Sequence, residues 1–179
     1  MRYRVMFKEF APSLWHLLGL ASARKQASQR PRAPSERTLG PAPPGSMRRR
    51  YDDLVVEMKE AYGIRVRKWR TSTSGCAWVV QFHDGTISRL IEAPYPRGPV
   101  SCAVFLHEIG HHAIGFNTHR LRCLEEYDAW RWSLDTMRQR GLNVTAAVEK
   151  RMDDAIRYAV RKARRRGLKQ LPARLAAYS

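Results

Sequence analysis

The chain has 179 residues, a formal net charge of +17 and three cysteines. This length accommodates one domain and a tail, and no stretch has the ~18 uninterrupted apolar residues of a membrane span, so we expect no membrane partner. Three cysteines are too few for a disulfide framework, which favours a reducing cytoplasm. The positive charge favours an acidic partner, nucleic acid first, although a solvated basic surface is the more common origin of such an excess.

Residues 1–46 have the composition of a tail. Five prolines fall close together among Ser, Gly and Arg residues: Pro31, Pro34, Pro41, Pro43 and Pro44. Such a segment buries too little apolar surface to fold by itself. The mildly apolar stretch over 12–20 faintly resembles a secretory signal, but it is short and polar residues interrupt the pattern. We therefore expect a Pro/Arg-rich tail or a non-structural extension before Met47, and a folded domain over 47–179.

The start of this domain predicts one helix and a small sheet. An apolar stripe at helical spacing indicates a helix over 47–62, which Gly63 ends. Runs of β-branched and aromatic residues indicate three strands, over 64–69, 76–82 and 86–91. Asp84-Gly85 is a hairpin turn signal between the last two strands. The expected fold is α+β, with a three-stranded antiparallel sheet packed against helices.

The stretch after a proline-rich loop contains the sequence His107-Glu108-Ile109-Gly110-His111. On a helix, residues four apart share one face, so His107 and His111 present two imidazoles to a single zinc ion, and Glu108 can reach a water on that ion. Ser101 is the expected N-cap of this helix and Gly115 its stop. A core helix with incidental histidines is the alternative, but buried polar groups need partners. The motif therefore predicts Zn²⁺ as a cofactor.

Two more helices are expected, from Arg120 to Arg140 and from Asn143 or Thr145 to about Arg166. One side of the last helix is apolar. Its other side is strongly basic, with Lys150, Arg151, Arg157, Arg161, Lys162, Arg164, Arg165 and Arg166. Contacts to phosphate groups or simple solvation would each explain this charge.

A catalytic zinc usually takes three protein ligands and one water, so a third ligand must come from outside the motif. The candidates near it in the chain are His112, His119, Cys123, Glu125, Glu126 and Asp128. At about 100° per residue, Glu126 falls on the apolar face that Trp130 marks, whereas Glu125 and Asp128 fall on the far side. A lone carboxylate on an apolar face is costly unless a metal is its partner, which favours Glu126. Cys123 shares that face, as a competing ligand or as a small buried apolar residue.

The motif His107-Glu108-Ile109-Gly110-His111 followed by Glu126-Tyr127-Asp128-Ala129, with Trp132 downstream, resembles the small gluzincin metallopeptidases of the ImmA/IrrE type. The resemblance covers the order of elements over 47–140, and residue matches only in His-Glu-x-x-His and Glu-x-x-Ala. It implies a zincin-like fold, with His107, His111 and Glu126 as zinc ligands and Glu108 as the catalytic acid/base. It also implies a DNA-binding repressor as substrate. The chain departs from the family at Trp130, where a small polar residue is usual, and it contains no recognisable helix-turn-helix.

Two functions follow from the sequence. The first is a zinc-dependent metallo-endopeptidase, in which Glu108 moves the proton of a zinc-bound water and an edge strand holds an extended peptide. The residue that stabilises the oxyanion stays open among His112, His119 and Tyr127. The alternative is a non-enzymatic nucleic-acid-binding module of a mobile element, acting through the basic last helix.

Overall fold

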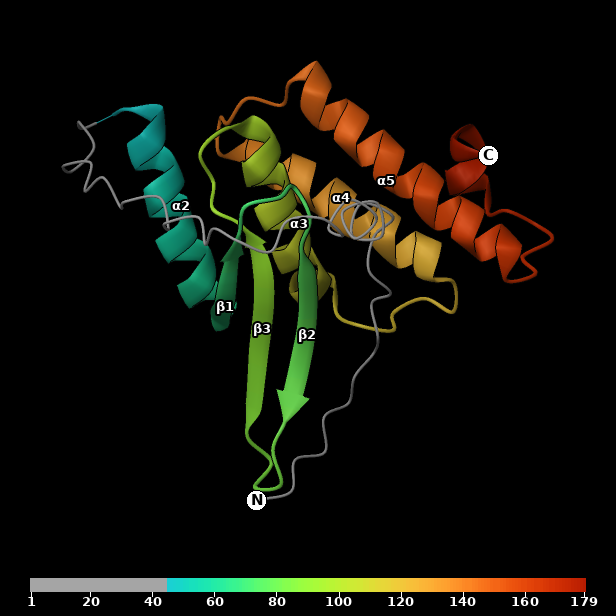
Figure 1. Ribbon diagram of the computed structural model, residues 1–179, viewed down its shortest axis with the longest axis horizontal. Helices are drawn as coiled ribbons and strands as arrows, with labels where there is room; N and C mark the ends of the chain where they lie inside the picture. Colours follow the sequence, from blue (N-terminus) through green and yellow to red (C-terminus); the bar gives the residue numbers. More distant parts are fainter. Residues whose placement is uncertain (1–44) are drawn as a thin grey trace, which may run out of the picture.

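The computed structural model describes residues 45–179, which form an α+β arrangement of helices around a small sheet (Figure 1). In chain order the elements are α2 (Met47–Ala61), β1 (Ile64–Arg70), β2 (Cys76–Gln81), β3 (Ile87–Pro94), α3 (Pro99–Ile114), α4 (Arg122–Gln139), α5 (Ala146–Arg165) and the 3-10 helix η1 (Ala173–Tyr178). Except for its last two residues, the tail expected over 1–46 lies outside the described residues. None of the helices in the described part is long and apolar enough to cross a membrane.

The sheet is mixed, so the prediction of an antiparallel sheet was wrong. Its strand order is β1-β3-β2, with β3 parallel to β1 and antiparallel to β2. The predicted hairpin turn is confirmed, because Gly85 has a φ of 83° and Thr86 N donates to Asp84 Oδ1 at 2.9 Å. Strand β3 packs against α3 and buries Ile91 and Ala93 completely on one face.

The helices follow the predicted apolar stripes, but their first residues differ in places. Ser46 caps α2, where its Oγ accepts a hydrogen bond from Arg49 N at 3.2 Å. Ser101 is not the N-cap of α3, because this helix already begins at Pro99, a residue whose fixed φ suits the first helical position. The Ser101 hydroxyl instead accepts from Gly98 N at 3.1 Å, inside the first turn.

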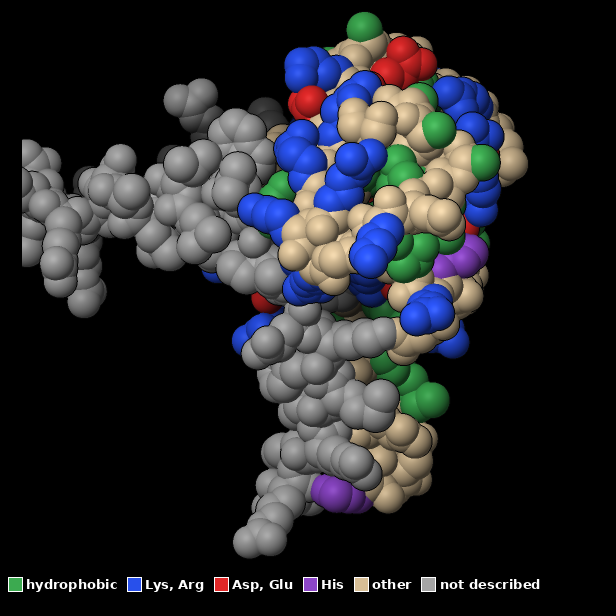
Figure 2. Space-filling view, turned by 90° about the vertical axis from the view of Figure 1, so that its right-hand side faces the viewer, with side chains coloured by type: hydrophobic (Ala, Val, Ile, Leu, Met, Phe, Trp, Pro, Cys, Tyr) green, Lys and Arg blue, Asp and Glu red, His purple; other side chains and the backbone are tan. Residues whose placement is uncertain are grey.

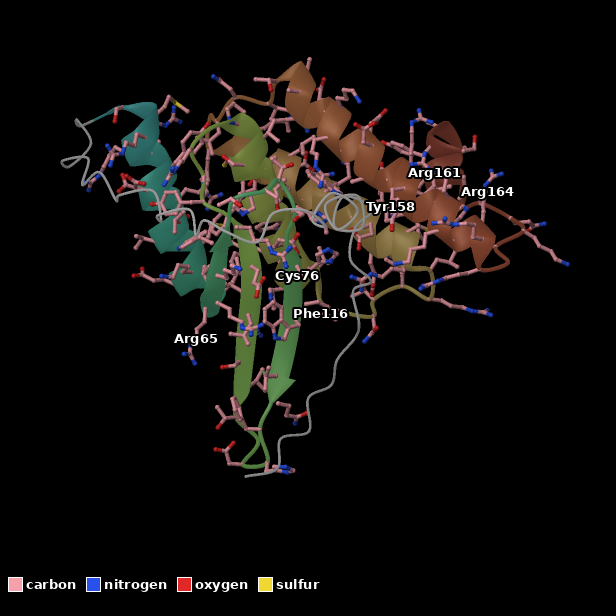
Figure 3. All side chains as sticks on the ribbon, in the orientation of Figure 1. Arg65, Cys76, Phe116, Tyr158, Arg161 and Arg164 are labelled. Carbon is pink, nitrogen blue, oxygen red and sulfur yellow. The ribbon has the colours of Figure 1, made fainter. Side chains whose placement is uncertain are left out.

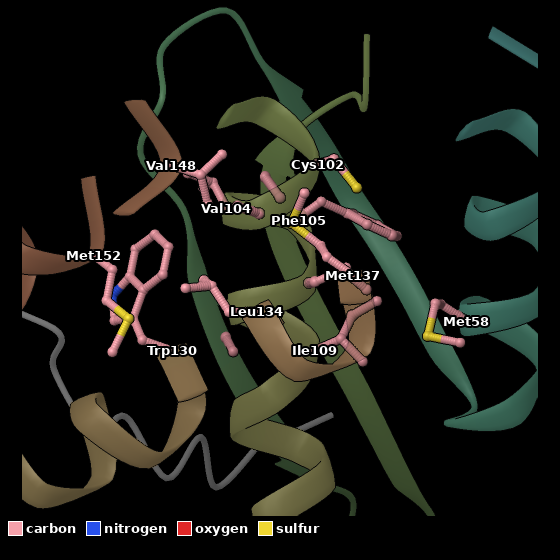
Figure 4. Packing of buried hydrophobic residues seen from close by; sticks show 14 of the residues in the cluster. Met58, Cys102, Val104, Phe105, Ile109, Trp130, Leu134, Met137, Val148 and Met152 are labelled. Carbon is pink, nitrogen blue, oxygen red and sulfur yellow. The ribbon is translucent and has the colours of Figure 1, made fainter. Parts of the chain in front are cut away.

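Helix α3 forms the centre of the core (Figure 4), with the sheet on one side and α4 and α5 on the other. It is buried continuously from Cys102 to His111. The Ser133 hydroxyl of α4 donates to Ala103 O of α3 at 2.7 Å. At Gly110 the two helices approach so closely that a Cβ would lie 2.8 Å from Ala129 O. This close packing brings α4 within reach of the histidines on α3.

Candidate metal centre

Three side chains converge where α3 meets α4: His107 and His111 from α3, and Glu126 from α4. Their potential ligand atoms all lie within 4.8 Å of one another. Glu126 Oε2 is 3.4 Å from His107 Nε2 and 3.8 Å from His111 Nε2. Both distances exceed the usual hydrogen-bond range. They are close to the ~3.4 Å that separates two ligands of a tetrahedral ion bound at ~2.1 Å. The residues present therefore fit a metal ion.

Burial and charge give these three groups the protonation states that a metal requires. Burial lowers the pKa of His107, and it lowers the pKa of His111 to about 3, so both imidazoles are neutral at neutral pH. Burial alone would raise the pKa of Glu126, but nearby His111, His107 and Arg122 lower it instead. Two neutral imidazoles and one carboxylate are the forms that bind a divalent cation.

Arg122 holds the carboxylate of Glu126 in place. Its Nε donates to Glu126 Oε1 at 3.3 Å, while its Nη1 donates to Glu125 Oε2 at 2.8 Å. Glu125 is therefore paired away from the histidines, as expected, but it is buried, with only 2% of its surface exposed. Asp128 also lies outside the cluster, where it pairs with His119 at 2.6 Å and with Arg174.

The other candidates from the sequence have partners elsewhere. Cys123 is 1% exposed and is not part of the metal-binding cluster, so it packs as a small apolar residue. His112 Nε2 lies 3.1 Å from Leu90 O, and burial lowers the pKa of this imidazole to about 4. The Tyr127 ring packs edge-to-face against Tyr178. None of His112, His119 and Tyr127 thus stands out as the group that stabilises an oxyanion.

Glu108 lies on α3 beside the histidines and against the loop that joins β1 to β2. It is 4% exposed. A Cβ at Gly75 would lie 2.6 Å from Glu108 Cγ, so only glycine leaves room for this side chain. Burial, followed by the charge of Glu126, raises the pKa of Glu108 well above its ordinary value. Sequence reasoning missed Gly75, whose only signal was a glycine directly before a strand.

Helix α5 reaches this centre through a stack of side chains. The Trp130 ring stacks on His107 with a centroid distance of 4.4 Å and an interplanar angle of 20°. The Arg151 guanidinium lies over the Trp130 ring, with Cζ 5.2 Å from its centroid, and Arg151 Nη2 donates to Thr73 O at 3.2 Å. The sequence indicated Arg151 only as one of many residues on a basic face, because its proximity to His107 depends on tertiary packing.

Comparisons of the chain with protein-family models, with curated proteins and with solved structures found no match. What the site does must therefore be inferred from the chemistry of His107, Glu108, His111 and Glu126.

Proposed function

We propose that the protein is a zinc-dependent metallo-endopeptidase with a zincin-like fold. The observation that carries this proposal is the spacing of two imidazole nitrogens and one carboxylate oxygen, with a buried glutamate beside them on the same helix. Imidazole and carboxylate ligands in a four-coordinate arrangement favour zinc over magnesium or calcium. Zinc would lower the pKa of a bound water and polarise the scissile carbonyl. The resemblance to ImmA/IrrE-type peptidases supports the same assignment.

Glu108 is the general base and acid of the proposed reaction. Its carboxylate accepts a proton from the attacking water and delivers it to the leaving amine. Gly75 and the body of α3 confine this carboxylate. Burial raises the pKa of Glu108 above its ordinary value, which makes its carboxylate a stronger proton acceptor.

The outer edge of β2 is the proposed binding surface for an extended peptide. Within residues 45–179, β2 pairs with β3 alone, so its other edge is available for strand addition. Burial, followed by the charge of Glu108, raises the pKa of the Cys76 thiol to about 11, which indicates that β2 begins near Glu108. A peptide added to this edge would extend past the metal centre. The resemblance implies that this peptide belongs to a DNA-binding repressor.

Metal analysis and one substitution test the proposal together. We expect about one zinc per chain after mild purification, since the site has three protein ligands. Glu108→Gln should retain that zinc, because Glu108 is not a ligand. It should lower hydrolysis of quenched fluorescent peptides by at least ~10²-fold, since an amide cannot carry the proton. Two results would contradict the proposal. One is a low zinc content that does not rise when zinc is added, and the other is a Glu108→Gln variant that is still active.

The exposed charge at the end of α5 favours nucleic-acid binding as a second function. Figure 2 shows many Lys and Arg side chains on the face at this end of the molecule. Arg161, Arg164 and Arg165 are exposed there and form the outer stripe of α5. Their contacts to phosphate groups would bring the protease to a substrate that is itself bound to DNA.

A triple variant in which glutamine replaces all three residues of the outer stripe tests this second function. We expect weaker binding to two unrelated DNA duplexes at low salt. The salt dependence should also become shallower, by ~0.9 in log–log slope for each phosphate that the variant no longer neutralises. Peptide hydrolysis should be unchanged, because the stripe is exposed on the helix surface. Equal DNA affinity of variant and parent protein would leave the stripe as a solvated surface.

A further inference from the structure

One side of α5 carries Arg151, Tyr158 and Lys162, which we call the α5 flank. These residues are seven and four positions apart, so they share one helix face. All three are partly buried, whereas Lys150 and the outer stripe are exposed. Figure 3 shows Tyr158 on α5. The flank differs from the outer stripe in burial, although Arg165 lies seven positions after Tyr158 and therefore borders it.

The pairing of α4 with α5 places this flank beside the metal centre. The two helices follow one another through the short loop after Gln139 and pack side by side (Figure 1). Arg151, near the start of α5, meets Trp130 of α4. The two helices run antiparallel. Glu126 precedes Trp130 by one turn on α4, so it lies beside a part of α5 that follows Arg151. Glu126 interacts electrostatically with both Arg151 and Lys162, which lie eleven positions apart on α5.

Contacts at the site hold Arg151 in position. Its guanidinium rests over Trp130, which stacks on His107. It also donates to Thr73 O, two residues before the glycine that touches Glu108. Of the five N–H donors of a guanidinium, this bond uses one. The others can bind a ligand that approaches the metal centre.

Within the described residues, the two cations of the flank form no direct ion pair. Among residues 45–179, neither Arg151 nor Lys162 has an ion pair within 4.0 Å, whereas the exposed Lys150 pairs with Asp154 at 2.7 Å. Of the acids that interact electrostatically with Arg151, Asp154 pairs with Lys150 and Glu126 with Arg122, while Glu108 is the buried carboxylate of the proposed general base. Partly buried cations without counterions attract carboxylates from a ligand more strongly than exposed cations do, because solvent screens them less.

We propose that the α5 flank selects peptides with acidic side chains on both sides of the scissile bond, one bound by Arg151 and the other by Lys162. This inference rests on the proposed function. At 1.5 Å per residue, the two cations are about 16 Å apart along α5, which corresponds to about five residues of extended peptide. The preferred substrate thus carries Asp or Glu at two positions about five residues apart, with the cleaved bond between them.

Matched peptides test this specificity. One quenched fluorescent peptide carries Glu at both positions, and three others carry Gln at either or both. The parent protein should cleave each Glu form with a kcat/KM about fivefold above its Gln form, the scale of a partly screened ion pair. Arg151→Gln should abolish the preference for Glu at one peptide position, and Lys162→Gln should abolish it at the other. Lys162→Glu should reverse the preference at that second position, so that a peptide with Lys is cleaved faster. Lys150→Gln is the matched control and should retain both preferences.

Equal cleavage of all four peptides by the parent protein would overturn the inference and leave the proposed function intact. The same holds if Lys150→Gln changes the preference as much as Lys162→Gln does. If the parent protein hydrolyses none of the peptides, peptide binding can still be measured. Fluorescence anisotropy of the labelled Glu peptide with the Glu108→Gln protein measures it. Peptide binding that depends on the flank, without any hydrolysis, would support acidic recognition and refute the peptidase. Binding of duplex DNA that Arg151→Gln and Lys162→Gln abolish would assign the flank to nucleic acid and overturn the inference.

Discussion

Glu125 and Glu126 are adjacent in the sequence, yet they have different environments. Glu126 directs one oxygen to the two histidines and the other to Arg122 Nε. Glu125 directs its carboxylate to Nη1 of the same arginine. A single guanidinium thus pairs with both acids and orients the one that faces the candidate metal centre. Groups that orient a ligand in this way commonly affect metal affinity.

At the residue scale, Arg122→Gln should weaken zinc binding by ~10- to 100-fold, the usual effect of losing such an orienting partner. The reason is that Glu126 loses the donor to its second oxygen, and Glu125 is left buried without its cation. Competition with a chromophoric chelator measures the affinity. Arg131→Gln is the matched control, because Arg131 forms an exposed ion pair with Asp135 on the same helix. An affinity equal to that of the control would show that Arg122 does not position Glu126.

Two glycines determine how closely the elements approach the metal centre. Gly110 lets α4 pack against α3, where a Cβ would meet the backbone at Ala129 O. Gly75 lets the loop between β1 and β2 lie against the side chain of Glu108. The first glycine affects the distance between ligands on two helices. The second affects only the carboxylate proposed to move the proton.

At the element scale, Gly75→Ala should impair catalysis without loss of metal. The new methyl group would overlap the Glu108 side chain, which must rotate away from its position. We expect a fall in kcat of ~10-fold or more, approaching the effect of losing a general base. Zinc content and the urea midpoint should stay close to those of the parent. Gly98→Ala is the control, because a Cβ there meets no atom within 4 Å. An unchanged kcat would mean that Glu108 tolerates displacement.

Local patterns predicted the helices and the hairpin turn, because residues a few positions apart determine those features. The pair His107 and His111 could be placed on one face from spacing alone, and the apolar stripe around Trp130 indicated which way Glu126 points. The central position of β3 could not be predicted, because it depends on pairing with β1 across a long stretch of chain. The same holds for Arg151 and Gly75, which reach the site only through packing of α5 and a loop.

In the whole molecule, the metal centre lies between two helices of the core. The described residues form layers in which α3 lies between the sheet and the pair α4 and α5 (Figure 1). An ion bound to His107, His111 and Glu126 would link α3 to α4 near their closest approach at Gly110. Metal binding is therefore expected to stabilise the entire folded domain, and not only a loop.

At this scale, zinc should raise the melting temperature of the metal-free protein. Free zinc at a thousandfold excess over Kd stabilises the native state by about 4 kcal/mol, which corresponds to a shift of ~10 °C or more. Differential scanning calorimetry with and without zinc measures it. Glu126→Gln should remove most of the shift, whereas Asp135→Asn, which changes an exposed carboxylate on α4, should retain it. Equal shifts in both variants would place the bound zinc elsewhere.

Helix α4 both packs in the core and carries Glu126. Its sequence therefore cannot change for one of these roles without affecting the other. Its Ser133 hydroxyl is bonded to Ala103 O, and Leu134 and Met137 are buried against α3. A substitution at any of these interior positions that shifts the helix would also move the Glu126 oxygen relative to the two imidazoles. Under the proposed function, positions that never contact a substrate would therefore come under selection for turnover. We expect the α3–α4 interface to accept few replacements during evolution, even where folding alone would allow them.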